Sequence, residues 1–125
     1  MRVKMASIHV TDPAKAHAFY TSVLGFDTLM AMPEHNLYIV RSRDAGMATG
    51  LLLEPSDHPV AKAYMEGLHA LGMPAIVFGV PDVAAAYERL RGQGVVFQGE
   101  PAEDPSGVSV VLDDTVGNFV QLHQD

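Results

Sequence analysis

An internal repeat limits the possible folds of this chain more than any other feature of its sequence. Residues 10–14 and 80–84, which lie 70 positions apart, carry valine, aspartate and alanine at matching places. Repetition at a fixed shift is the signature of a duplicated structural unit. Each copy also reads as the end of a strand, an aspartate that caps a helix, and then an amphipathic helix. We therefore expect two related modules within the 125 residues.

Three segments have the apolar spacing of amphipathic helices. In the first, between Asp12-Pro13 and Gly25, the apolar positions are Ala16, Phe19, Tyr20, Val23 and Leu24. In the last, between Asp82 and Gly92, they are Val83, Ala86, Tyr87 and Leu90. The middle segment repeats Val60, Tyr64, Leu68 and Leu71 between Pro59 and Gly72. Proline near the start and glycine near the end are typical of helix boundaries, so the middle segment is predicted as a linking helix.

Strand-like runs separated by turn residues follow the first and last helices. The predicted strands are residues 28–32, 37–41 and 48–53 in the first half and residues 95–98, 108–112 and 119–123 in the second. Together with the strand before each helix, each half reads as β-α-β-β-β. The predicted fold class is α+β in a single domain, with the first module over about residues 1–56, the linking helix over about 58–72 and the second module over about 73–125.

Composition excludes several classes of function. A formal net charge of −7 with only 8 scattered Lys and Arg residues argues against nucleic acid as a partner, because phosphate binding needs clustered positive charge. The sequence has no apolar run near the roughly 20 residues that span a bilayer and no signal-peptide pattern at its start, so we expect a cytoplasmic protein with no membrane partner. The absence of cysteine excludes disulfides, thiolate metal sites and cysteine nucleophiles.

The arrangement resembles the vicinal oxygen chelate superfamily, which includes glyoxalases, bleomycin resistance proteins and extradiol dioxygenases. The resemblance lies in the two modules, in the Val-x-Asp at residues 10–12, in the end of the first helix at residues 19–26 and in residues 113–118 before the last strand. It implies two curled mixed sheets that form a concave pocket, and a homodimer. It also implies that catalytic members hold a divalent metal with His or Glu from the first and last strands of each module.

The four positions that this resemblance assigns to metal ligands carry unsuitable residues. Counting back from Asp12 gives Met5, and the 70-residue shift gives Ala75 as its counterpart; the last-strand positions are Gly50 and Gln121. Divalent metal sites need several converging imidazole or carboxylate ligands, and only Gln121 carries an oxygen. We therefore expect no metal and no other cofactor.

Side chains two apart in a strand face the same way, so the strands that line the implied pocket can be assigned pocket-facing residues. They are Met5, Ser7 and His9; Gly50, Leu52 and Glu54; Ala75, Val77 and Gly79; and Gln121 and His123. Tyr38 and Arg41, on a neighbouring strand, are expected to reach the mouth of the pocket. The other histidines, His17, His35, His58 and His69, are expected to be solvated.

Three interpretations of His9, Glu54 and His123 remain open. They can be ordinary residues at strand ends, polar anchors in an apolar ligand pocket, or a displaced metal site or acid/base pair. The second interpretation predicts a metal-independent protein that binds a small organic ligand. The third predicts a glyoxalase-like lyase, isomerase or dioxygenase, so the sequence leaves open whether the chain is an enzyme. A further alternative is an accessory module that acts only through protein contacts.

Overall fold

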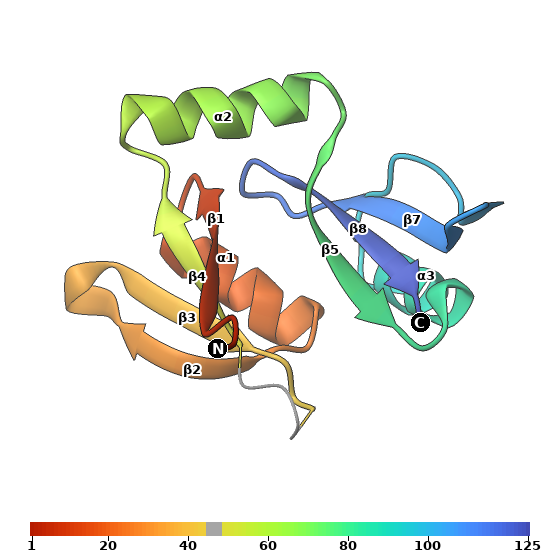
Figure 1. Cartoon of the computed structure of the whole chain (residues 1–125), viewed down its shortest axis with the longest axis horizontal. Helices are drawn as coiled ribbons and strands as arrows, with labels where there is room; N and C mark the ends of the chain where they lie inside the picture. Colours follow the sequence, from red (N-terminus) through yellow and green to blue (C-terminus); the bar gives the residue numbers. More distant parts are fainter. Residues whose placement is uncertain (45–48) are drawn as a thin grey trace. The chain divides into compact units, whose positions relative to one another are not determined.

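The computed structural model describes residues 1–44 and 49–125. The chain divides into two compact units, Met1–Met65 and Glu66–Asp125, which we call module 1 and module 2 and describe separately (Figure 1). Helix α2 (Pro59–Ala70) begins in module 1 and ends in module 2. It corresponds to the predicted linking helix.

Module 1 contains one four-stranded mixed sheet with the strand order β1-β4-β3-β2. The parallel pair is β1 with β4, and the other pairs are antiparallel. Its elements are β1 (Met5–Val10), α1 (Pro13–Ala18), the π-helical turn η1 (Phe19–Val23), β2 (Asp27–Met32), the 3₁₀ turn η2 (Pro33–His35), β3 (Leu37–Arg41) and β4 (Gly50–Pro55).

Module 2 repeats this topology, with the strand order β5-β8-β7-β6 and a parallel pair formed by β5 and β8. Its elements are β5 (Pro74–Val80), α3 (Val83–Gly92), β6 (Ala102–Asp104), β7 (Gly107–Asp113) and β8 (Phe119–Gln124). Two β-α-β-β-β modules with mixed sheets confirm the α+β fold predicted from the repeat.

The repeated aspartates begin both helices. The Asp12 carboxylate accepts a hydrogen bond from the backbone N–H of Lys15 at 3.2 Å, and the Asp82 carboxylate accepts one from Ala85 at 3.0 Å. Each bond satisfies a backbone donor that has no partner inside the helix, a contribution of about 1 kcal/mol. The two copies of the repeat therefore have the same structural role.

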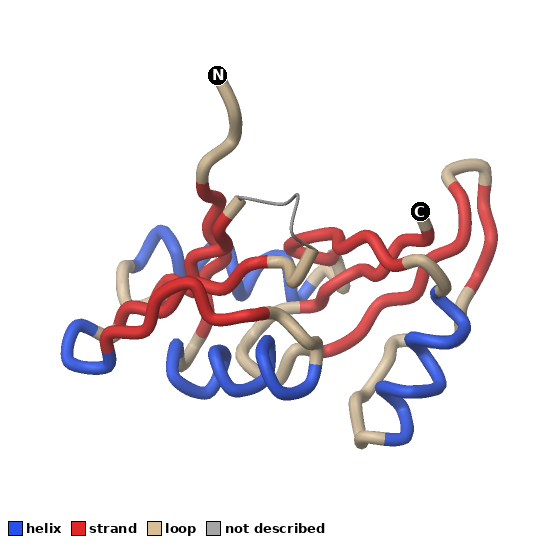
Figure 2. The backbone as a smooth tube through the Cα atoms, turned by 90° about the horizontal axis from the view of Figure 1, so that it is seen from below, coloured by secondary structure: helices blue, strands red, loops and turns tan. Residues whose placement is uncertain are grey.

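Helices α1 and α3 each pack on one face of the sheet in their own module, as Figure 2 shows. The strand residues on the helix-covered faces are buried: Ile8, Val10, Leu51 and Leu53 in module 1, and Val110, Leu112, Val120 and Leu122 in module 2. The alternate residues belong to the opposite face of each sheet, which we call the open face. Because successive strand residues point to opposite sides, the apolar helix-facing rows fix which residues lie on the open face.

The structure differs from the sequence-based prediction in three local features. The predicted strand at 95–98 is wrong, because only Phe97 forms an isolated bridge, with Leu112, and the strand in this part of the module is β6. The first helix changes to π-helical geometry, with the N–H of Leu24 bonded to the carbonyl of Phe19 at 3.1 Å. The strand predicted from residue 48 begins at Gly50, and residue 48 lies outside the described residues.

No helix in the described part of the chain has the length and apolar character needed to cross a bilayer.

Candidate functional site

The open face of module 1 brings six of the predicted site residues into cross-strand pairs. In the parallel pairing of β1 with β4, Met5 lies beside Gly50, Ser7 beside Leu52 and His9 beside Glu54. The pairs run from the apolar Met5 end of the strands to the polar His9 end. Met5 and Ser7 are exposed, while His9, Leu52 and Glu54 are half-buried. This face is therefore an accessible apolar surface with a few polar groups.

The open face of module 2 is arranged in the same way. Val77 lies beside Gln121 and Gly79 beside His123 in the pairing of β5 with β8. Val77 has 55% of its surface exposed, while Gln121 and His123 are half-buried. Ala75 lies in an irregularity of this ladder between Pro74 and Ile76.

Tyr38 does not belong to the open face, which corrects the expectation from the sequence. Ile39 lies opposite Leu52 in the antiparallel pairing of β3 with β4, so Ile39 shares the open face and its neighbour Tyr38 points to the helix-covered side. The Tyr38 ring is buried and lies 5.0 Å from the ring of His17 on α1. Arg41, opposite Gly50, is exposed at the edge of the open face.

Apolar side chains crowd the open face around Gly50. A Cβ added to Gly50 would lie 3.0 Å from Cγ2 of Ile39, 3.2 Å from Cδ2 of Leu29 and 3.8 Å from Cγ of Met5. Sequence reasoning missed Leu29 and Ile39. Their alternation along β2 and β3 was visible, but the pairing that brings them to Gly50 was not.

The registers of the two sheets correct one assigned ligand position. Val10 pairs with Pro55 in module 1, and the equivalent Val80 pairs with Gln124 in module 2. Three residues before these partners lie Leu52 and Gln121, so Leu52, and not Gly50, is the counterpart of Gln121. Leu52, like Gly50, has no side-chain atom that can bind a metal, so the position still lacks a metal ligand.

The residues at the family metal positions do not fit a divalent metal. These residues are Met5 and Leu52 in module 1 and Ala75 and Gln121 in module 2, and Gln121 alone among them has a side-chain oxygen, whereas divalent metal sites need several imidazole or carboxylate ligands. Within residues 1–44 and 49–125, no three His, Asp or Glu side chains are grouped in a way that could hold a metal ion. The displaced metal site considered for His9, Glu54 and His123 therefore has no support in the described residues.

Two of the remaining histidines have partners that the sequence did not reveal. His17 was expected to be solvated, but its Nε2 lies 2.7 Å from the hydroxyl oxygen of Thr28, and its ring contacts Tyr38. His69 is exposed, yet its ring stacks on Phe119 at 4.5 Å between centroids. His35 and His58 are exposed, as predicted.

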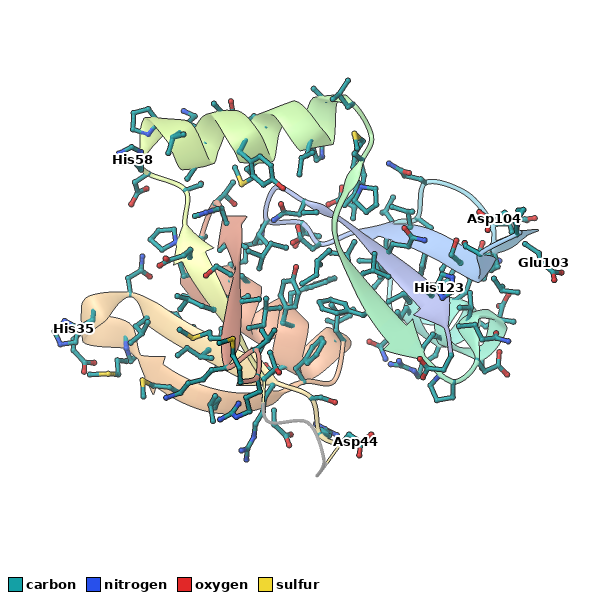
Figure 3. All side chains as sticks on the ribbon, viewed as in Figure 1. His35, Asp44, His58, Glu103, Asp104 and His123 are labelled. Carbon is teal, nitrogen blue, oxygen red and sulfur yellow. The ribbon has the colours of Figure 1, made fainter. Side chains whose placement is uncertain are left out.

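His123 lies in polar surroundings at the edge of the open face of module 2 (Figure 3). It is paired with Ser109 on β7, and the carboxylate of Asp104 interacts with it electrostatically. Hydrogen bonds from the hydroxyl and backbone N–H of Ser106 lower the pKa of Asp104 below its ordinary value, with a smaller contribution from His123. This end of the face therefore carries a carboxylate and an imidazole that attract each other electrostatically.

Comparison with known proteins identifies the family. Residues 2–122 match the sequence profile of the Glyoxalase/Bleomycin resistance protein/Dioxygenase superfamily. The uncharacterized protein YurT of Bacillus subtilis (strain 168) is 39% identical over 126 residues, which cover 99% of this chain and 99% of YurT.

Two solved structures are similar over nearly their whole length. UcmS2 is 28% identical with a TM-score of 0.79, and the similarity covers 98% of this chain and 97% of UcmS2. TnmS3, an antibiotic binding protein from Streptomyces sp. CB03234, is 27% identical with a TM-score of 0.74, covering 99% of this chain and 95% of TnmS3. With two β-α-β-β-β modules and a family match across almost every residue, the chain belongs to the glyoxalase, bleomycin resistance protein and dioxygenase superfamily.

Proposed function

We propose that this protein binds a small organic molecule without a metal, as a homodimer in the cytoplasm. The observation that carries the proposal is a complete family fold whose metal positions hold Met5, Leu52, Ala75 and Gln121. Without metal-binding atoms at these positions, a metal that would polarise a substrate has no ligands. An apolar surface with a few polar groups is what small-molecule sites generally present. Binding is therefore the function that these residues support best.

The proposed contact residues are those of the two open faces. Met5, Leu52 and Val77 supply apolar area, and Ser7, His9, Glu54, Gln121 and His123 supply hydrogen-bonding groups. Gly50, Gly79 and Ala75 leave room for the ligand or for neighbouring side chains. The similarity to TnmS3, which binds an antibiotic, supports a ligand of the organic, drug-like class.

Family membership and exposed apolar side chains support the proposed homodimer. Met5, Leu29, Met30 and Val77 each expose between 44% and 55% of their surface. Large exposed apolar side chains that cluster on a surface are usually covered by a partner or a ligand. We propose a second copy of the chain as that partner.

A thermal-shift screen tests the proposed function. The chelator-treated protein is heated with a library of uncharged and weakly acidic organic compounds, and a ligand present at about 100 times its Kd is expected to stabilise the fold by about 2.7 kcal/mol.

Ser7→Arg, which places a long cation on the open face, should abolish the ligand-induced rise in melting temperature. Ser22→Arg, at an exposed position in η1, is the matched control and should retain it. A shift that appears only after a divalent metal is restored contradicts metal independence.

One pairing favours acid/base catalysis as a second candidate function. His9 and Glu54 are cross-strand neighbours, an arrangement in which a carboxylate can orient an imidazole. Turnover of any ligand found in the screen, abolished by His9→Asn while binding persists, would establish this alternative. Ligand binding without turnover would exclude acid/base catalysis of that ligand and support the binding function.

A further inference from the structure

Module 1 contains an open recess at the start of helix α2, beyond the ends of strands β1 and β4. The recess has a volume of about 500 Å³ and is lined by His9, His58, Val60, Ala61 and Tyr64. Figure 3 shows His58 at the beginning of α2. Pockets for small organic ligands range from about 300 to 1,000 Å³ and are mostly apolar, so both the size and the lining suit such a ligand.

The helix side of the recess exposes unusually large apolar side chains. Val60 and Tyr64 are four residues apart, and therefore neighbours on the helix surface, with 71% and 60% of their surfaces exposed. Ala61 beside them is buried. An exposed tyrosine ring next to an open recess offers a surface on which a flat ring can stack.

The polar groups of the recess include two imidazoles, those of His9 and His58, and the proton of the His58 ring can be located. The Nδ1 atom of His58 accepts a hydrogen bond from the backbone N–H of Val60 at 3.2 Å. A backbone N–H only donates, so Nδ1 carries the lone pair and the neutral ring carries its proton on Nε2. His58 can therefore donate a hydrogen bond to a ligand without giving up its contact to the helix.

The charges around the recess argue against an anionic ligand. Glu54 is the cross-strand neighbour of His9, Asp57 precedes His58 in the chain, and the whole chain has a formal net charge of −7. Carboxylates near the recess repel a ligand carboxylate or phosphate and do not affect an uncharged carbonyl.

We propose that this recess binds an uncharged aromatic group bearing a carbonyl acceptor, with the ring against Tyr64 and the carbonyl oxygen accepting from His58. The proposal rests on the proposed function, because His9 belongs to both the recess and the open face. It names the ligand class and adds His58, Val60, Ala61 and Tyr64 to the site. None of these four residues was among the pocket residues predicted from the sequence.

A titration of the full chain with acetylnaphthalene tests the recess directly. Backbone amide chemical shifts of Val60, Ala61 and Tyr64 should move and saturate. Acetyldecalin, which lacks the aromatic ring, and naphthoate, which carries a charge, should each bind about tenfold more weakly, the size of one stacking or charge interaction.

Variants separate the roles of the ring and the imidazole. Tyr64→Ala and His58→Asn should each weaken acetylnaphthalene binding about tenfold. Asparagine is a preferred helix cap, so His58→Asn should keep the start of α2 intact, which the unchanged amide shifts of the helix will show. His35→Asn, the same substitution at an exposed histidine of module 1, is the matched control and should bind like the wild type.

The outcomes distinguish the recess from the broader proposal. If only the amide chemical shifts of Ser7 and Leu52 changed, and Tyr64→Ala had no effect on the affinity for acetylnaphthalene, the recess proposal would be overturned. Small-molecule binding on the open face would remain. Saturable shifts at Tyr64 that require an added divalent metal would support the recess and contradict metal independence. No binding of acetylnaphthalene or of any screened compound would overturn both proposals.

Discussion

Gly50 shows how single residues determine what the open face of module 1 can hold. It sits beside Met5 and is enclosed by the side chains of Ile39 and Leu29. Ile39 is buried and branched at Cβ, so it has little freedom to move aside. A larger residue at position 50 would therefore meet packed apolar atoms.

Gly50→Glu is expected to destabilise the fold by about 1–3 kcal/mol, the usual cost of overpacking. The measurement is the free energy of unfolding in urea. Gly67→Glu is the matched control, because a Cβ at Gly67, an exposed position in α2, meets no atom within 4 Å. Equal stability of the two variants would contradict the crowding around Gly50.

The Asp104 carboxyl is expected to titrate at a lower pH in the folded chain than in a peptide of residues 102–108. The hydroxyl and backbone N–H of Ser106 stabilise the carboxylate form and so lower the pKa. The resulting stabilisation is present above the pKa of the unfolded chain and is lost as the pH falls through the folded pKa. NMR titration of the Asp104 side-chain carbon should show its pKa rising in Ser106→Ala. An unchanged pKa in this variant would rule out the hydroxyl as the main cause.

Which residues of β1, β4, β5 and β8 share the open faces could be predicted from the sequence, because a strand alternates with a period of two. The pairs Ser7 with Leu52 and His9 with Glu54 follow from that alternation once the strands are adjacent. Tyr38 could not be placed in this way, since a shift of one residue in the β3–β4 register reverses its face. His58 and Tyr64, which line the proposed recess, were not among the predicted residues because their helix gives no sequence signal for what it faces.

Among the structural elements, the helices and the long strands were predictable and the short irregular ones were not. α2 and α3 carry clear apolar periodicity and recognisable end signals, and β3 matches its predicted bounds at residues 37–41. β6 has three residues, all exposed, and pairs only with β7, so it shows no apolar alternation to detect. The π-helical geometry of η1 depends on tertiary contacts that spacing alone does not encode.

The turn between β7 and β8 depends on one buried carboxylate. Asp114 is fully buried and accepts hydrogen bonds from the backbone N–H groups of Val116 and Asn118, each at 2.9 Å, and from the Asn118 side chain at 3.3 Å. These bonds hold the turn in which Gly117 adopts a φ of 104°, a value that favours glycine. This turn determines where β8 begins, at Phe119.

Asp114→Ala is expected to cost about 2–4 kcal/mol of unfolding free energy, because it leaves buried donors without their acceptor. Asp113→Ala is the comparison, since Asp113 is half-buried and its carboxylate accepts a hydrogen bond from the N–H of Thr115 at 2.8 Å, which the substitution removes. Its expected cost is about 1 kcal/mol. Thermal and urea unfolding measure both, and a smaller loss for Asp114→Ala than for Asp113→Ala would contradict this account of the turn.

Duplication of one structural unit explains why the two short modules share one topology and one pattern of open and helix-covered faces. Family membership could be predicted from the repeat and three short motifs, because they fix helix starts and turns that the fold requires. Ligand identity could not, since it depends on side chains that vary on an unchanged framework.

The proposed homodimer predicts a sedimentation mass twice that of the chain. Val77→Glu places a charge on the exposed apolar surface of module 2 and should weaken association at least about tenfold. Val96→Glu, at another exposed valine outside the predicted site, should leave the mass unchanged. A wild-type protein that sediments as a monomer at high concentration would contradict the dimer.

Binding of organic ligands without a metal is the property on which the proposed function depends. The most direct measurement is elemental analysis by mass spectrometry of untagged protein purified from metal-replete medium, performed on the sample used for ligand binding. We expect substoichiometric transition metal together with full ligand-binding capacity. Close to one bound metal ion per chain, lost together with ligand binding in Gln121→Ala, would rule out metal-independent binding.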